Sequence, residues 1–136
     1  YELILATLWQ ESRMNSKTVY YNTNGSYDSG IAQMNSWYIK WYGNLAGFEE
    51  PNFDPFDDKK AVEALIVAFD YFRSQWLNRE VEDNLELKQM ILNTYNMGFT
   101  GYSNYIDRNN KISRYYSDNI LRYKALLETS GNLGGR

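Results

Sequence analysis

The chain has 136 residues, with 14 Lys and Arg against 17 Asp and Glu, and it contains neither cysteine nor histidine. The lack of both residues excludes a thiol nucleophile, a Ser-His-Asp triad, a thiolate or imidazole zinc site and a disulfide framework. Proton transfer must therefore use Asp, Glu, Tyr, Lys or water, and carboxylates are the first candidates. The net charge of −3 argues against a general nucleic-acid-binding protein, which would carry a basic surface.

The length is typical of one domain folded around a single core. Tyr1 opens directly into a helical pattern with no signal-peptide pattern before it, so we expect a mature or excised domain. The longest apolar run, Ala64–Phe69, is far shorter than the roughly 20 residues that span a bilayer, and we expect no membrane span. We predict one domain over residues 1–129, followed by a flexible tail over residues 130–136.

Hydrophobic periodicity predicts a first helix over residues 2–13. Residues 15–35 are rich in Asn, Thr, Ser, Gly and Tyr, which predicts a loop or a short irregular hairpin with its turn at Asn24-Gly25. A small β element is therefore expected near residues 18–33.

The rest of the chain has helical patterns separated by Gly- and Pro-bearing loops. These helices are predicted near residues 37–42, from a cap at Asp57 or Asp58 to Trp76, over residues 85–96 before a helix-ending Gly98, and over residues 112–128. The expected fold class is mostly α, with at most a small β-hairpin or irregular β element.

Glu11 is the first candidate for chemistry. It follows Ile4 by seven residues and Leu8 by three, so its side chain leaves the helix on the same side as both apolar residues. Partial desolvation penalises the charged form of a carboxyl and raises its pKa, which suits a general acid near neutral pH. The alternative is a solvated Glu in the last turn of a helix.

Three short motifs occur in order along the chain: Glu11-Ser12 at a helix end, the segment Gly30–Asn35 (Gly-Ile-Ala-Gln-Met-Asn), and Tyr95-Asn96-Met97-Gly98. Together they resemble the lysozyme-like superfamily, in particular lytic transglycosylases associated with secretion and conjugation systems and with phages. The first block is also similar to c-type lysozymes, in which the Glu and the Gln are likewise separated by 22 positions. The resemblance covers roughly residues 2–100.

The resemblance implies a cofactor-free, metal-free enzyme that cleaves the β-1,4 bond between N-acetylmuramic acid and N-acetylglucosamine in peptidoglycan. Glu11 would protonate the glycosidic oxygen and then, as base, take the proton of the muramoyl 6-hydroxyl, so that a 1,6-anhydro ring closes. Tyr95 would lie near Glu11. The residues expected to bind substrate or to shape its cleft are Ser12, Asn24, Ser26, Gln33, Asn35, Trp37, Tyr95 and Asn96.

Asp28 leaves a second mechanism open. It lies 17 positions after Glu11, where c-type lysozymes carry their second carboxylate. Retaining hydrolysis needs a partner carboxylate about 5–5.5 Å from the acid, so a muramidase that uses both residues is the alternative. In the other interpretation Asp28 hydrogen-bonds the turn at Asn24–Tyr27. A non-catalytic cell-wall-binding or structural module is the alternative from another class.

The aromatic residues that follow the Gln33 segment are candidates for stacking on sugar rings, with core packing as the alternative. They are Trp37, Tyr38, Trp41 and Tyr42. We expect at least one of these two Trp to be buried, and we expect Trp9 and Trp76 in the core.

Asp54, Asp57 and Asp58 lack EF-hand spacing, so capping and solvated charge explain them better than calcium binding. The expected partner is the peptidoglycan glycan strand, with additional domains or a phage-tail, conjugation or secretion assembly as further partners, and no nucleic acid. The expected location is extracytoplasmic: periplasmic, secreted or virion-associated.

Overall fold

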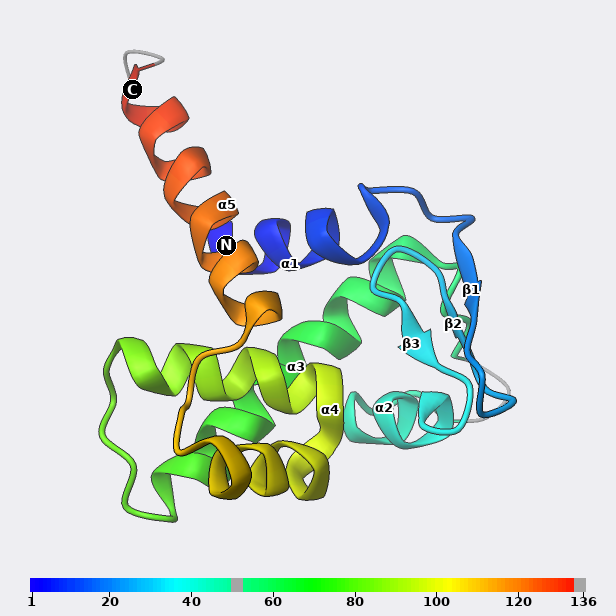
Figure 1. The fold of residues 1–136 in the computed structure, drawn as a ribbon. Coiled ribbons are helices and arrows are strands. Elements are labelled where there is room, and N and C mark those ends of the chain that lie inside the picture. The colour runs from blue at the N-terminus through cyan, green and yellow to red at the C-terminus, as the bar shows by residue number, and fades with distance from the viewer. Residues whose placement is uncertain (50–52, 134–136) are drawn as a thin grey trace. The chain divides into compact units, whose positions relative to one another are not determined.

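The computed structural model describes residues 1–49 and 53–133, with side chains described as far as residue 130. Within these residues the fold is mostly helical with one small antiparallel sheet, as predicted (Figure 1). The elements are α1 (Glu2–Ser12), β1 (Val19–Tyr21), β2 (Tyr27–Ser29), β3 (Met34–Asn35), α2 (Ile39–Leu45), α3 (Asp58–Leu77), α4 (Leu85–Asn109) and α5 (Tyr115–Leu133). The chain divides into two compact units, Tyr1–Ala68 and Phe69–Arg136, and α3 runs through the boundary between them.

The first unit begins with α1, which ends one residue before the predicted position. Arg13 takes a left-handed conformation (φ 55°), and its N–H donates to the Trp9 carbonyl, which closes the helix. Ala6 and Leu8 are buried on the inner face. Trp9 is 43% exposed, with the Arg13 guanidinium 5.2 Å from its ring centroid, so the prediction that Trp9 lies in the core is wrong.

The β element falls where it was predicted and forms a three-stranded sheet in the order β1-β2-β3. Gly25 supplies a positive φ (89°) in the turn between β1 and β2. Ser29 faces Met34 across the β2–β3 pair, and both are buried, whereas the neighbouring pair Asp28 and Asn35 is only half-buried. Because side chains alternate along a strand, Asp28 and Asn35 share the face opposite to the core.

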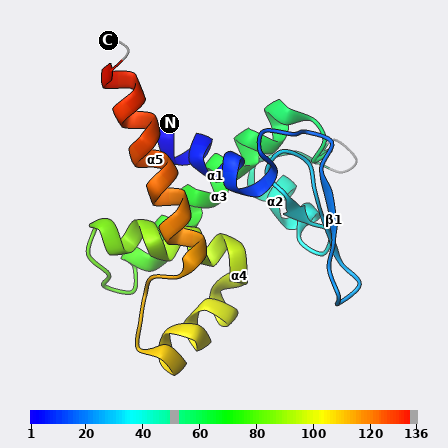
Figure 2. The same ribbon diagram turned by 45° about the horizontal axis from the view of Figure 1, so that its top comes forward.

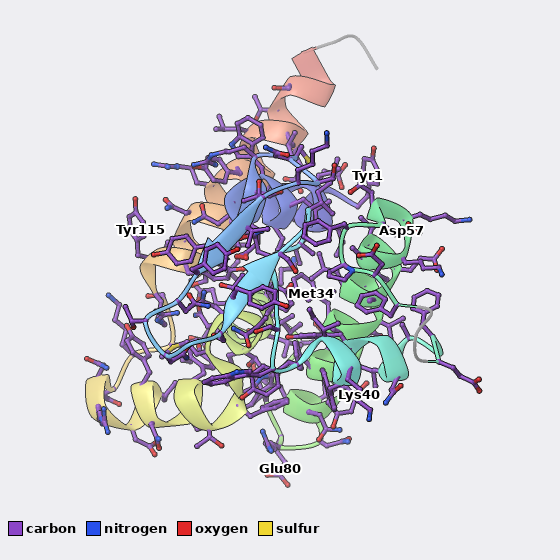
Figure 3. All side chains as sticks on the ribbon, turned by 90° about the vertical axis from the view of Figure 1, so that its right-hand side faces the viewer. Tyr1, Met34, Lys40, Asp57, Glu80 and Tyr115 are labelled. Atoms are coloured by element: carbon purple, nitrogen blue, oxygen red, sulfur yellow. The ribbon has the colours of Figure 1, made fainter. Side chains whose placement is uncertain are left out.

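Helix α2 follows the sheet and begins two residues later than predicted. Gly43 is buried in it, and a Cβ there would lie 2.9 Å from the Phe53 Cβ, so the close approach of Phe53 favours glycine. The Asp57 carboxylate accepts the Lys60 N–H over 3.2 Å, so the predicted cap of α3 is confirmed. Figure 3 marks Met34 on β3, Lys40 on α2 and Asp57 at the start of α3.

In the second unit, the side chain of Asn84 caps α4 by accepting the N–H groups of Glu86 and Leu87. The helix was predicted to end at Gly98. Gly98 does leave the helical conformation (φ 77°, ψ 164°), but a second helical arm continues from it to Asn109 (Figure 2). Helix α5 starts later than predicted and runs to Leu133, so part of the predicted tail is helical, and residues 134–136 lie outside the described residues.

The core of the second unit is aromatic. Trp76 is 6% exposed, which confirms its predicted burial, and its indole N–H donates to the Thr94 hydroxyl over 2.8 Å. The ring of Trp76 lies 5.5 Å from that of Phe99 and 6.1 Å from that of Tyr102. Among the described residues, no helix is long and apolar enough to cross a membrane.

Candidate active site

Glu11 lies half-buried in the last turn of α1. The neighbouring Ser12 is buried, and its hydroxyl donates to the Ile31 carbonyl oxygen over 2.7 Å, with the Leu8 carbonyl oxygen 3.3 Å away. This hydrogen bond ties the end of α1 to the Gly30–Gln33 turn. Ser12 thereby fixes where Glu11 stands, and its contact with substrate stays a prediction.

Gln33 holds the same turn from within. Its Nε2 donates to the Thr18 and Gly30 carbonyl oxygens, each over 2.9 Å, and the side chain is 9% exposed. Its φ of 52° is unusual for a residue other than glycine, and such strain persists only where the surroundings fix it. The donor atoms of the Gln33 amide thus shape the loop, and its contact with a sugar stays a prediction.

Gly30 explains the first position of the motif. It has a φ of 80°, and a Cβ there would lie 1.9 Å from the Pro55 carbonyl oxygen. Only glycine allows both this conformation and this close approach of two backbone segments.

Asp28 faces the side chain of Asn35. The Asn35 Nδ2 donates to Asp28 Oδ1 and to Ser26 Oγ, each over 2.9 Å, and Asn35 Oδ1 accepts the Trp37 N–H. All hydrogen-bonding groups of the Asn35 amide are thus engaged within the protein, and one of the groups that they hold is a carboxylate.

The turn between β1 and β2 is held by other residues. Asn24 Oδ1 accepts both the N–H and the hydroxyl of Ser26, over 3.0 and 2.6 Å, and Asn22 Nδ2 donates to the same hydroxyl over 3.1 Å. Asp28 lies beyond this turn, in β2, and the Asn35 amide links its carboxylate to the turn residue Ser26. Ser26 is 1% exposed and Asn24 is exposed, and the place of both residues at a substrate cleft stays a prediction.

The charges of Glu11 and Asp28 both act on the hydroxyl of Tyr42. Its phenol is buried, and burial raises the pKa of the hydroxyl well above its ordinary value, with further increases from the charge of Glu11, from Tyr38 and from the charge of Asp28. Coulombic effects fade with distance, so both carboxylates lie within electrostatic reach of one hydroxyl. The sequence left Tyr42 open between stacking on a sugar and core packing, and its burial agrees with the packing alternative.

The other three aromatic residues of this segment are exposed: Trp37 by 59%, Tyr38 by 56% and Trp41 by 39%. The expectation that at least one of these two Trp is buried is wrong. Their rings are accessible for stacking on a ligand.

Tyr95 and Asn96 belong to the second compact unit. Tyr95 is half-buried with its ring 5.7 Å from that of Phe69, and the exposed Asn96 accepts a hydrogen bond from the Arg114 guanidinium over 2.7 Å. Gly98 follows them at the bend of α4, so the Tyr-Asn-x-Gly motif marks the end of a helical arm. The approach of Tyr95 to Glu11 stays a prediction.

Across residues 1–49 and 53–133, no group of three or more carboxylates is placed to hold a metal ion. The carboxylate of Asp54 accepts the Phe56 N–H over 2.9 Å, as an Asx turn does. Compared with protein-family models, curated proteins and solved structures, the chain gives no match.

Proposed function

We propose that this chain is a lytic transglycosylase that cleaves the β-1,4 bond between N-acetylmuramic acid and N-acetylglucosamine in peptidoglycan. The observation that carries the proposal is the setting of Glu11. It is half-buried, its neighbour Ser12 is tied to the Gly30–Gln33 turn, and its charge acts on the buried Tyr42 hydroxyl. A partly desolvated carboxyl held in place by a hydrogen-bonded loop is what general acid catalysis needs.

Glu11 would carry out both proton transfers. As a carboxylic acid it donates its proton to the glycosidic oxygen while the bond from that oxygen to C1 breaks, and the substrate's acetamido oxygen supports the cationic C1. As a carboxylate it then takes the proton of the 6-hydroxyl, whose oxygen bonds to C1 and closes the 1,6-anhydro ring. Glu11 ends protonated, and no water is consumed.

A muramidase is the second candidate, and the position of Asp28 favours it. The Asn35 amide donates to the Asp28 carboxylate. The charge of Asp28 acts on the same Tyr42 hydroxyl as the charge of Glu11. In this mechanism Asp28 would be the nucleophile or the stabilising anion, and water would complete the reaction.

The products separate the two enzymes. Digested peptidoglycan analysed by mass spectrometry should contain anhydro-muropeptides, each one water lighter than the product of hydrolysis. Reducing ends alone would overturn the transglycosylase in favour of the muramidase. The variant Asp28→Asn should keep activity within about tenfold for a transglycosylase and lose at least 100-fold for a muramidase.

The role of Glu11 has its own test. Glu11→Gln should lose at least about 100-fold in rate, the usual scale for acid–base catalysis, and should keep binding to sacculi. The matched control is Glu63→Gln, which makes the same change at an exposed Glu of α3 in the first unit. Sacculus binding without any cleavage by the wild-type chain would instead support a non-catalytic wall-binding module.

The proposed substrate also implies where the protein acts and what it binds. Peptidoglycan lies outside the cytoplasmic membrane, so the proposal includes an extracytoplasmic site of action, and glycan strands are the proposed partner. The exposed rings of Trp37 and Trp41 would stack on sugars of those strands.

A further inference from the structure

The buried hydroxyl of Tyr42 has no role in the two proton transfers assigned to Glu11. The residue lies in the middle of α2 and is 8% exposed, although its neighbour Trp41 and the residue one turn earlier, Tyr38, are both exposed. The Trp41 ring meets the Tyr42 ring edge-on at 5.1 Å. The ring of a phenylalanine would fill the same space, and the hydroxyl of a buried tyrosine usually has a hydrogen-bond partner.

Hydrogen bonds within the first unit lead from the candidate site to this helix. The Tyr38 N–H donates to the Asn35 carbonyl oxygen and the Tyr42 N–H donates to the Tyr38 carbonyl oxygen, each over 2.9 Å. Tyr38, which caps the start of α2, is therefore hydrogen-bonded to the residue whose side chain holds Asp28. On the other side of the loop, Ser12 ties Glu11 to Ile31.

The surroundings of the Tyr42 hydroxyl determine whether it acts as a hydrogen-bond donor. Burial and the nearby carboxylates raise the pKa of Tyr42, so the phenol keeps its proton at neutral pH and offers an O–H donor. Of the charges that act on this hydroxyl, that of Glu11 has the largest effect, ahead of that of Asp28. A neutral donor beside an anion is stabilised when the O–H points toward the anion.

We propose that Tyr42 is a positioning residue for Glu11. Its O–H points toward the Glu11 carboxylate and holds that carboxylate in the orientation in which the carboxylate takes the proton of the 6-hydroxyl. This inference rests on the proposed function. Tyr42 touches neither reacting bond and acts through Glu11. The donor is also a reason why Glu11 can remain half-buried as an anion between its two proton transfers.

The test compares Tyr42→Phe with the wild type. The substitution removes one oxygen and keeps the ring, so kcat should fall about 10- to 100-fold, the size of one hydrogen bond to a charged group, with little change in KM. Removing a donor from a carboxylate makes its proton harder to lose, so the alkaline limb of the pH–rate profile should move to higher pH. Tyr115→Phe, at a position 80% exposed on α5, should match the wild type in both measurements.

A second measurement needs no activity. In protein labelled with ¹³C at the glutamate carboxyl, the Glu11 resonance is assigned by its loss in Glu11→Gln. The midpoint of its titration should lie at higher pH in Tyr42→Phe than in the wild type. Replacing Tyr42 with 3-fluorotyrosine, a more acidic phenol and a better donor, should move the midpoint to lower pH, and this variant keeps the hydroxyl if Tyr42→Phe does not fold.

The activity measurements and the Glu11 titration together distinguish a failure of the role of Tyr42 from a failure of the proposed function. Coincident Glu11 titrations in the wild type and both variants would overturn the role of Tyr42, whatever the activity. A wild type that leaves peptidoglycan intact would overturn the proposed function, and with it the assigned step. A drop in kcat without movement of the alkaline limb or of the Glu11 titration would assign Tyr42 to packing and would also overturn the inference.

Discussion

Asn35 and Asp28 face each other across the β2–β3 pair, and the Asn35 amide donates to the Asp28 carboxylate over 2.9 Å. The second hydrogen of the same nitrogen is directed to Ser26, which the turn residue Asn24 also holds. A single side chain thus couples the second carboxylate of the candidate site to the hairpin turn. The geometry makes Asn35 a residue that organises the site from within the protein.

Asn35→Ala should therefore destabilise the protein by about 2–3 kcal/mol, because it removes three hydrogen bonds, one of them to a carboxylate. Denaturant unfolding followed by circular dichroism measures this loss. Asn44→Ala makes the same change at an exposed position of α2 and should stay within about 0.5 kcal/mol of the wild type. Equal stability of the two variants would mean that the Asn35 network contributes little.

Two glycines with similar backbone conformations give a second prediction. Gly30 (φ 80°) would place a Cβ 1.9 Å from the Pro55 carbonyl oxygen, whereas a Cβ at Gly25 (φ 89°) meets nothing within 4 Å. Gly25→Ala should cost about 1–2 kcal/mol from the left-handed conformation alone. Gly30→Ala should cost about 3 kcal/mol or more, because the steric overlap adds to that strain. Urea midpoints compare the two, and equal losses would show that the loop at Pro55 moves away without cost.

Local signals in the sequence were enough to predict the elements that depend on them. Asn24-Gly25 predicted the turn, and Asp57 predicted the start of α3, because both rest on hydrogen bonds between residues close in sequence. The end of α1 followed in the same way from helical periodicity. Glu11 could be chosen as the candidate acid because its position at that end follows from the same pattern.

Packing between elements could not be read in this way. Trp9 and Tyr42 both lie in helices, but the burial of each depends on which face the rest of the fold covers, and that information is not local. The engagement of Asn35 with Asp28 also depends on strand register, which sequence pattern alone did not define. The continuation of α4 beyond Gly98 was missed because a glycine that bends a helix and one that ends it leave the same local signal.

The buried phenols predict how stability changes in alkali. Burial raises the pKa of both Tyr42 and Tyr102, so each keeps its proton in the folded state when it has lost it in the unfolded state. Above about pH 10, the usual phenol pKa, the folded state binds more protons, and the free energy of unfolding should fall as the pH rises.

Tyr42→Phe removes the contribution of Tyr42, so its free energy of unfolding should fall less steeply above about pH 10 than that of the wild type. Denaturant midpoints measured at intervals from pH 8 to 11.5 give this slope. Tyr115→Phe, at an exposed phenol, should keep the wild-type slope. A wild-type slope in Tyr42→Phe would contradict the retained proton on Tyr42.

The bend of α4 predicts opposite effects for two glycines three residues apart. Gly98 has φ 77° and ψ 164°, a combination that is essentially restricted to glycine, although a Cβ there would meet nothing within 4 Å. Gly98→Ala should therefore cost about 1–3 kcal/mol from backbone strain alone. Gly101 lies in the second helical arm, where a Cβ would make an ordinary 3.5 Å contact with the Met97 Cβ, so Gly101→Ala should stabilise the protein by about 0.5–1 kcal/mol. Urea unfolding of both variants measures the two signs. If Gly98→Ala stabilised the protein as Gly101→Ala does, α4 could run straight at this point, and the glycine of the Tyr-Asn-x-Gly motif would not be required for the bend that ends the arm carrying Tyr95.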